Sequence, residues 1–178
     1  MPAALTTILR WQHDLTWSLL DLHLAALHDE DCFWEPAAGC WTVREVGGVW
    51  LPDWVEPEPD PPPVATIGWL TWHVGWWWGE ALARTAGQPP PPRAEVTWPG
   101  SAAGAVAWLR GLRARWVEVL DRLTDTDLDA VAPYPWQDRP DRTLAHLVAW
   151  LNAELMKNAA EIGQLRLQRL AVGRRPAR

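Results

Sequence analysis

The segment from about Arg142 to Leu170 carries the ionisable residues best spaced for chemistry. If it is a helix, with 100° of rotation per residue, a polar stripe falls within about 80° on one face. Its members are His146, Trp150, Ala153, Lys157, Glu161 and Gln164. Lys157 is the only lysine of the chain. An ammonium group can act as a general acid or base, or can anchor an anionic group.

This polar stripe has two interpretations. In the first, it faces solvent, and Lys157 and Glu161 form an ordinary surface pair worth about 0.5 kcal/mol. In the second, it is the wall of an internal cavity, because a tryptophan and an alanine interrupt an otherwise polar face. The opposite face of the same helix suits a core. Its apolar residues are Leu144, Leu147, Leu151, Leu155 and Ile162.

A second stripe with an ionisable group lies in the tryptophan-rich segment from Ile67 to Ala83. Its members are Trp69, Trp72, His73, Trp76 and Glu80. A lone histidine among tryptophans is usually a packed core residue. Two stripes that each carry an ionisable group nevertheless favour a shared cavity, in which His73 would shuttle protons. Trp77 and Trp78 are expected to pack elsewhere in the bundle or at a subunit contact, so a homodimer is one expectation.

Long helices are expected to position these stripes. Apolar residues at steps of three and four predict a first helix from Leu5 to about His28. The tryptophan-rich helix is predicted to reach about Ala86 and to end at Gly87. The letters PGS at 99–101 predict the start of a third helix, and the polar stripe belongs to a fourth. The residues of the third helix expected to face a core are Val106, Leu109, Leu112, Trp116, Leu120 and Leu123.

The connections between these helices are long and rich in proline. In CWTVREV, Thr42 and Glu45 have the spacing of a capping box, which predicts a short helix that Pro52 stops. The segments LPDWVEPEPDPPPVA and PYPWQDRP cannot be helical. We therefore expect an all-α four-helix bundle with long crossings and extra short helices, in one domain over residues 1–170. The basic residues 171–178 are predicted to form a flexible tail.

Composition argues against several classes of partner. A net charge of −6 does not suit nucleic acid, which needs a basic face. Cys32 and Cys40 form no CxxC unit, so free thiols in a reducing cytoplasm are expected. His13 and Asp14 interrupt the apolar run that a signal peptide needs. The tryptophan-rich segment is shorter than the ~20 apolar residues of a membrane span and contains His73. We expect a cytoplasmic protein with no nucleic-acid or membrane partner.

The chain contains 16 tryptophans but one phenylalanine and one tyrosine. Codons for Trp, Arg, Ala, Gly and Pro are rich in G and C, so a GC-rich bacterial genome accounts for much of this excess.

The segments TIGWLTWHVGWWW, CWTVREV and NAELMKNAAEIGQLR resemble the DinB superfamily of bacterial four-helix proteins, over roughly residues 5–170. That resemblance implies kinship with divalent-metal-dependent S-transferases that use thiols such as mycothiol or bacillithiol. Many other members have no known activity.

The resemblance also implies a metal site. In the family it uses one histidine of an early helix and two ligands four residues apart on the last helix. The histidine matches His73, and the pair falls on Lys157 and Glu161, with Asn158 beside them. If CWTVREV instead marks the ligand-bearing helix, the slot falls near Val49, which cannot ligate. An ammonium repels a cation, which leaves two ligands where a catalytic zinc needs three.

We therefore expect a degenerate metal site without a metal cofactor, in which the Lys157 ammonium takes the place of the metal beside Glu161. Two functions stay open. The chain is either an enzyme related to the thiol S-transferases, acting on a small apolar or aromatic molecule, or a non-catalytic binding or stress-associated protein. Lys157, His73 and Glu161 would carry any catalysis. The expected pocket residues are Trp69, Trp72, Trp76, His146, Trp150 and Asn158.

Overall fold

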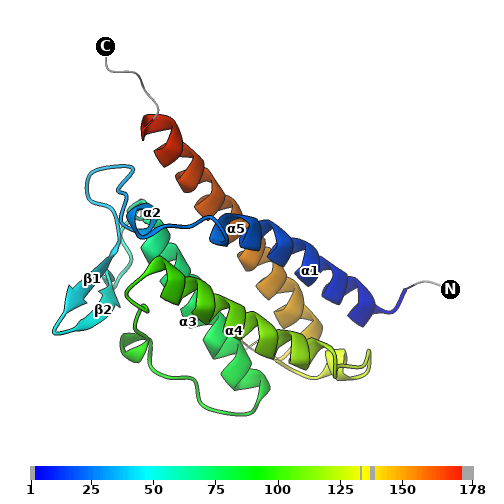
Figure 1. Ribbon diagram of the computed structural model, residues 1–178. Coiled ribbons are helices and arrows are strands. Elements are labelled where there is room, and N and C mark those ends of the chain that lie inside the picture. Colours follow the sequence, from blue (N-terminus) through cyan, green and yellow to red (C-terminus); the bar gives the residue numbers. More distant parts are fainter. Residues whose placement is uncertain (1–2, 133, 137–138, 174–178) are drawn as a thin grey trace.

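The computed structural model describes residues 3–132, 134–136 and 139–173 (Figure 1). The four long helices are α1 (Leu5–Leu24), α3 (Ile67–Thr85), α4 (Ala102–Leu120) and α5 (Leu144–Gly173). The short elements are α2 (Asp29–Cys32), β1 (Val43–Val46), β2 (Val49–Pro52) and two 3-10 turns, η1 (Arg93–Glu95) and η2 (Asp127–Asp129). α1 packs chiefly against α5, while α3 packs against both α4 and α5. The predicted all-α bundle is confirmed.

The ends of α3 and α4 follow local signals in the sequence. The Thr66 side chain accepts a hydrogen bond from the backbone N–H of Trp69 at 3.3 Å, and the Ser101 side chain accepts one from Gly104. Each cap satisfies a donor that the first helical turn leaves without a partner. Gly87 follows α3 with φ of 68°, a conformation that glycine adopts without strain.

Two predicted helix ends differ from the structure. The first helix ends at Leu24, short of the predicted His28. Just after α1, the carbonyl of Ala26 accepts a hydrogen bond from the Arg166 side chain of α5 at 3.1 Å. This contact fixes the connection to α5 before α2 begins. The last helix runs to Gly173, beyond the predicted end at Leu170. Residues 174–178 of the predicted tail lie outside the described residues.

The predicted short helix at CWTVREV is wrong, because this segment forms an antiparallel hairpin of β1 and β2. Gly47 and Gly48 both have positive φ, 61° and 84°, which is the requirement of the two-residue turn that best matches strand twist. Thr42 does not cap a helix. Its hydroxyl instead accepts a hydrogen bond from the Thr66 hydroxyl at 3.1 Å.

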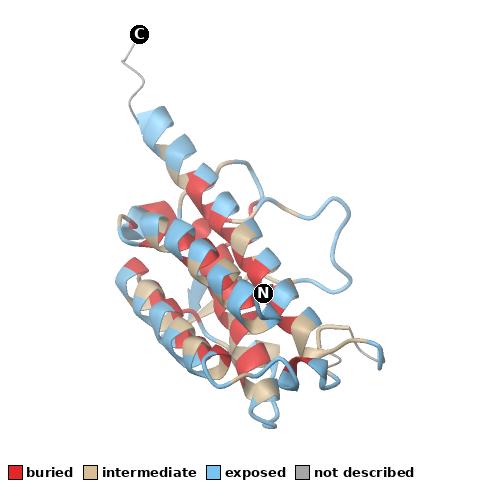
Figure 2. Ribbon diagram, turned by 90° about the vertical axis from the view of Figure 1, so that its right-hand side faces the viewer, coloured by how far each residue is buried: buried red, intermediate tan, exposed pale blue. Residues whose placement is uncertain are grey.

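The core lies between the four long helices, whose inner faces are buried (Figure 2). α3 is buried on most sides, and Trp72 and Trp78 have no exposed surface. Gly75 allows α4 to approach, since a Cβ atom there would lie 2.0 Å from the Trp108 ring. Of the core residues predicted for the third helix, Leu109, Leu112, Trp116 and Leu120 of α4 are buried. Val106 of α4 and Leu123, which follows α4, are partly buried. Within the described ranges, no helix has the length and apolar composition needed to cross a bilayer.

Candidate functional site

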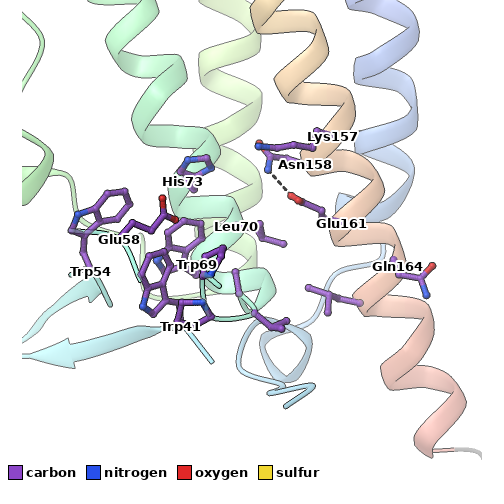
Figure 3. A pocket seen from close by; sticks show the side chains of 15 residues that line it. Trp41, Trp54, Glu58, Trp69, Leu70, His73, Lys157, Asn158, Glu161 and Gln164 are labelled. Carbon is purple, nitrogen blue, oxygen red and sulfur yellow. Dashed lines mark hydrogen bonds between the residues drawn. The ribbon is translucent and has the colours of Figure 1, made fainter. Parts of the chain in front are cut away.

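A pocket of about 580 Å³ lies between α3, α5 and the proline-rich crossing that precedes α3 (Figure 3). We call it the aromatic pocket. Its lining includes Trp41, Trp54, Trp69, His73, Lys157 and Asn158. Three tryptophans stand on one side of it, and the polar residues of α5 stand on the other. Some residues of each stripe found in the sequence therefore line the same cavity.

Stacked indole rings form the wall of the aromatic pocket. Trp41 stacks on Trp69 with ring centroids 5.2 Å apart, and Trp54 lies nearly parallel to Trp69 at 6.1 Å. The Arg93 guanidinium lies 4.0 Å from the centroid of the Trp54 ring. The Trp69 indole N–H donates to the carbonyl of Asp53 at 2.8 Å. These contacts hold the wall in one orientation, because each ring is fixed by a neighbour or by a hydrogen bond.

His73 lies where this wall ends. Its ring stacks on Trp69 with centroids 4.9 Å apart and an interplanar angle of 15°. Its Nδ1 atom is buried and has no hydrogen-bond partner among the described residues. Burial, with a smaller effect from the charge of Lys157, lowers the pKa of His73 to about 4. The imidazole is therefore neutral at pH 7.

The predicted pair between Lys157 and Glu161 is wrong. The Lys157 ammonium instead pairs with Glu154 at 2.7 Å, and half of the Lys157 side chain is exposed. Glu161 is exposed and accepts a hydrogen bond from the Asn158 amide at 2.7 Å. Lys157 thus lies at the mouth of the aromatic pocket and not inside it. The reason is the cost of desolvating an ammonium, which a long and flexible side chain avoids by reaching water.

Asn158 is the buried polar residue on the α5 side, with 1% of its surface exposed. Its Nδ2 donates to the Glu161 carboxylate, and its Oδ1 is buried without a partner in the described part of the chain. A carboxylate accepts hydrogen bonds and does not donate them. This contact therefore fixes the orientation of the amide and leaves Oδ1 as the unpaired acceptor.

Comparison with known families agrees with this arrangement of helices. The model of the DinB superfamily matches residues 12–162. The chain belongs to the DinB superfamily. No curated protein matches it.

The positions that match the DinB-type ligand set carry two donor groups in this chain. His73 and Glu161 offer two donor groups, and the third position is Lys157, whose ammonium has no lone pair to give. In the described part of the chain, no three His, Cys, Asp or Glu side chains are placed to share a metal ion. Cys32 and Cys40 are both buried as free thiols. The matching positions therefore supply one donor group fewer than the three protein ligands of a catalytic zinc site.

Other predicted pocket residues of this DinB protein lie elsewhere. Trp72 lines no described pocket, because it is fully buried and donates to the carbonyl of Val96 at 2.7 Å. His146 is exposed and interacts with Thr143 and Trp136, so its predicted place in the pocket is wrong. It precedes Lys157 by three helical turns, too far along α5 to reach the same cavity.

Trp76 and Trp150 line a second pocket of about 400 Å³, which we call the side pocket. His73 and Lys157 line both pockets, so the two adjoin one another between α3 and α5. Tyr134 completes the aromatic wall of the side pocket, and the centroid of the Tyr134 ring lies 5.5 Å from that of Trp150. The single pocket expected from the sequence thus corresponds to two adjoining pockets, and Trp76 and Trp150 line the second one.

Sequence reasoning missed Trp41 and Trp54, which supply two of the three indole rings of the aromatic wall. Trp41 lies just before β1 and Trp54 just after β2, so neither stands on a helix with a readable period. One signal was available: Trp54 stands among prolines and carboxylates, where an isolated large aromatic residue has no local core to join.

Proposed function

We propose that the aromatic pocket binds a small, neutral aromatic molecule that carries a hydrogen-bond donor. Its volume falls within the range of about 300–1,000 Å³ that is usual for small-molecule sites. Its wall of stacked indoles suits a flat aromatic ring. The observation that carries the proposal is the buried, unpaired Asn158 Oδ1 on the α5 side of the pocket, opposite this wall. If the Asn158 side chain turns toward the pocket, a donor on the ligand would satisfy this acceptor.

Charge in the aromatic pocket disfavours an anionic ligand. Glu58 and Glu161 line it, and the ammonium of Lys157 is already paired with Glu154. His73 adds no positive charge at pH 7, because burial lowers its pKa to about 4. A phenol or a similar aromatic alcohol matches these surroundings better than an aromatic carboxylate does.

Isothermal titration with 2-naphthol and with 2-methoxynaphthalene tests this function. The two probes share a ring system, but the methyl ether has no O–H to donate. We expect the wild type to bind 2-naphthol about tenfold more tightly, the value of one hydrogen bond of about 1.4 kcal/mol. Asn158→Leu should abolish this preference. Equal binding of both probes to the wild type, or no binding of either, would exclude the proposal.

A matched pair of histidine variants locates the binding site. His73→Phe replaces the imidazole in the aromatic pocket, whereas His146→Phe makes the same change outside it. We expect weaker binding of 2-naphthol only for His73→Phe, since that change removes the polar end of the wall. If both variants bind as the wild type does, the probe occupies another part of the molecule.

A second candidate function is thiol transfer to a small electrophile, related to that of the DinB S-transferases. The observation in its favour is that two adjoining pockets share His73 and Lys157, because a transferase must hold two reactants side by side. The thiol sulfur would bond to the electrophilic carbon, the leaving group would depart, and the thiol proton would pass to His73 or to water. A pH-dependent turnover that Lys157→Ala abolishes would support transfer over simple binding.

A further inference from the structure

α1 is apolar on two sides, but the core covers only one of them. Leu9, Trp17, Leu20 and Leu24 are buried inside the bundle. A second apolar row follows the outer side at steps of three and four residues, with Trp11 63% and Leu22 65% exposed. Together with these two, the exposed row contains Leu5, Ile8, Leu15 and Leu19. A helix that only covers a core does not need this second row.

α5 lies beside α1 (Figures 1 and 2). The two helices approach closely, since a Cβ atom at Gly163 would lie 2.4 Å from the His23 ring. With 100° of rotation per residue, the outer flank of α5 next to α1 carries mostly small residues. These residues are Ala149, Ala153, Met156, Ala160 and Leu167. We call this flank, together with the exposed row of α1, the α1/α5 face.

The α1/α5 face contains no charged residue. The charged residues of α1 lie on the side toward α4, where Asp14 pairs with Arg113 at 3.1 Å and Asp21 pairs with Arg110 at 2.9 Å. A helix that binds an anionic membrane surface instead combines its apolar row with Lys and Arg on its polar flanks. The lack of charge therefore favours a protein partner with an equally apolar surface.

The size of the α1/α5 face suits a stable interface. The 20 residues of α1 span about 30 Å, and two adjacent helices cover a width of about 20 Å. The resulting area of roughly 600 Å² equals the largest apolar patches of ordinary monomers and approaches the ~800 Å² per partner of a standard interface.

We propose that the protein is a homodimer that associates through the α1/α5 face. The face complements itself: α1 presents large side chains, and the adjacent flank of α5 presents alanines. Under a twofold axis, the leucines of each α1 fit over the small residues of the partner's α5, and both contacts form twice. A four-helix layer closes in this way and leaves no apolar row in water.

The dimer does not depend on the aromatic pocket. Lys157 and Glu161 lie further around α5 than Ala153 and Ala160, toward α3. A partner on the α1/α5 face therefore leaves the pocket open, so either proposal can fail without the other.

Two alanine variants with the same substitution test the dimer. Ala153→Glu places a charge in the α1/α5 face, and Ala114→Glu places one on the exposed side of α4. Both residues are exposed and lie inside helices, so neither change should disturb the fold of the single chain. We expect Ala153→Glu to weaken dimerisation at least about a hundredfold, because the interface would bury a carboxylate among apolar side chains. Ala114→Glu should dimerise as the wild type does.

Sedimentation equilibrium at loading concentrations from about 1 to 100 µM gives the association constants. Proteins with interfaces of this size are expected to associate within this concentration range. Circular dichroism of Ala153→Glu must show wild-type helicity, and Leu15→Glu supplies a second variant on α1 if it does not. A monomeric wild type throughout this range would overturn the proposal. So would a dimer that neither Ala153→Glu nor Leu15→Glu weakens, or binding of the wild type to neutral phosphatidylcholine vesicles that both variants abolish.

Discussion

Lys157 forms an ion pair with Glu154, which precedes it by one turn of α5, with 2.7 Å between Nζ and Oε2. Glu161, which follows by one turn, accepts from Asn158 instead. Both carboxylates were within reach of the ammonium along the helix. The pairing with Glu154 leaves Lys157 half exposed, while Glu161 is held by the buried amide of Asn158.

This pairing predicts a small effect of Lys157→Ala on stability. An exposed ion pair contributes little, so we expect the free energy of unfolding to fall by less than about 1 kcal/mol. Urea denaturation followed by circular dichroism measures the change. A loss of about 3–5 kcal/mol would instead indicate a buried charge left without its partner.

A histidine in place of Lys157 should create a metal site. Lys157→His would add an imidazole to His73 and Glu161 and complete three ligands. Zinc at a hundred times its dissociation constant should then stabilise the variant by about 2.7 kcal/mol, seen as a higher melting temperature. Wild type and Lys157→Ala are the controls and should not respond.

We also expect elemental analysis of the wild type to find less than one equivalent of any transition metal. A stoichiometric metal there would mean that a ligand besides His73 and Glu161 is in place.

His13 should make stability depend on pH. It is completely buried beside Trp78, and burial lowers the pKa of His13 from 6.5 to about 4. Between these values the unfolded chain binds the proton more tightly, so stability is lost as pH falls from about 6.5 to 4. The loss should approach about 3 kcal/mol.

Urea denaturation at several pH values between 4 and 7.5 measures this loss, and His13→Leu should flatten the dependence. His73 titrates with the same sign, so His73→Phe shows its separate share. An unchanged slope in His13→Leu would assign the pH dependence to other groups.

The contact between α3 and α4 should tolerate no side chain at Gly75. A Cβ atom there would lie 2.0 Å from the Trp108 ring, whereas one at Gly79, on the same helix, meets no atom within 4 Å. Gly75→Ala should therefore destabilise the bundle by about 1–3 kcal/mol through overpacking. Gly79→Ala should stabilise it by up to about 1 kcal/mol, since alanine favours a helix. Thermal melts of the two variants should shift in opposite directions, and equal shifts would mean that Trp108 moves aside freely.

The sequence by itself determined the elements whose signals are local. Thr66 and Ser101 cap α3 and α4, and Gly87 follows the end of α3, because capping and positive φ depend on a few adjacent residues. Helical periodicity also placed His73 and Lys157 on faces that meet at one cavity. The hairpin also has a local signal in the two glycines of VGGV, whereas the predicted short helix rested on the capping-box spacing of Thr42 and Glu45.

The tertiary structure decided those contacts for which the sequence offered several equivalent partners. Lys157 had a carboxylate at a comparable distance on either side, and only the buried position of Asn158 next to Glu161 settles which one it pairs with. Trp54 joins the pocket wall through contacts with residues far along the chain, which no periodicity records. Both sides of α1 are apolar, so its sequence alone cannot say which side faces the core. The packing of α5 and α3 against Leu9 and Trp17 decides it, because burial is a property of neighbours that only the folded chain brings together.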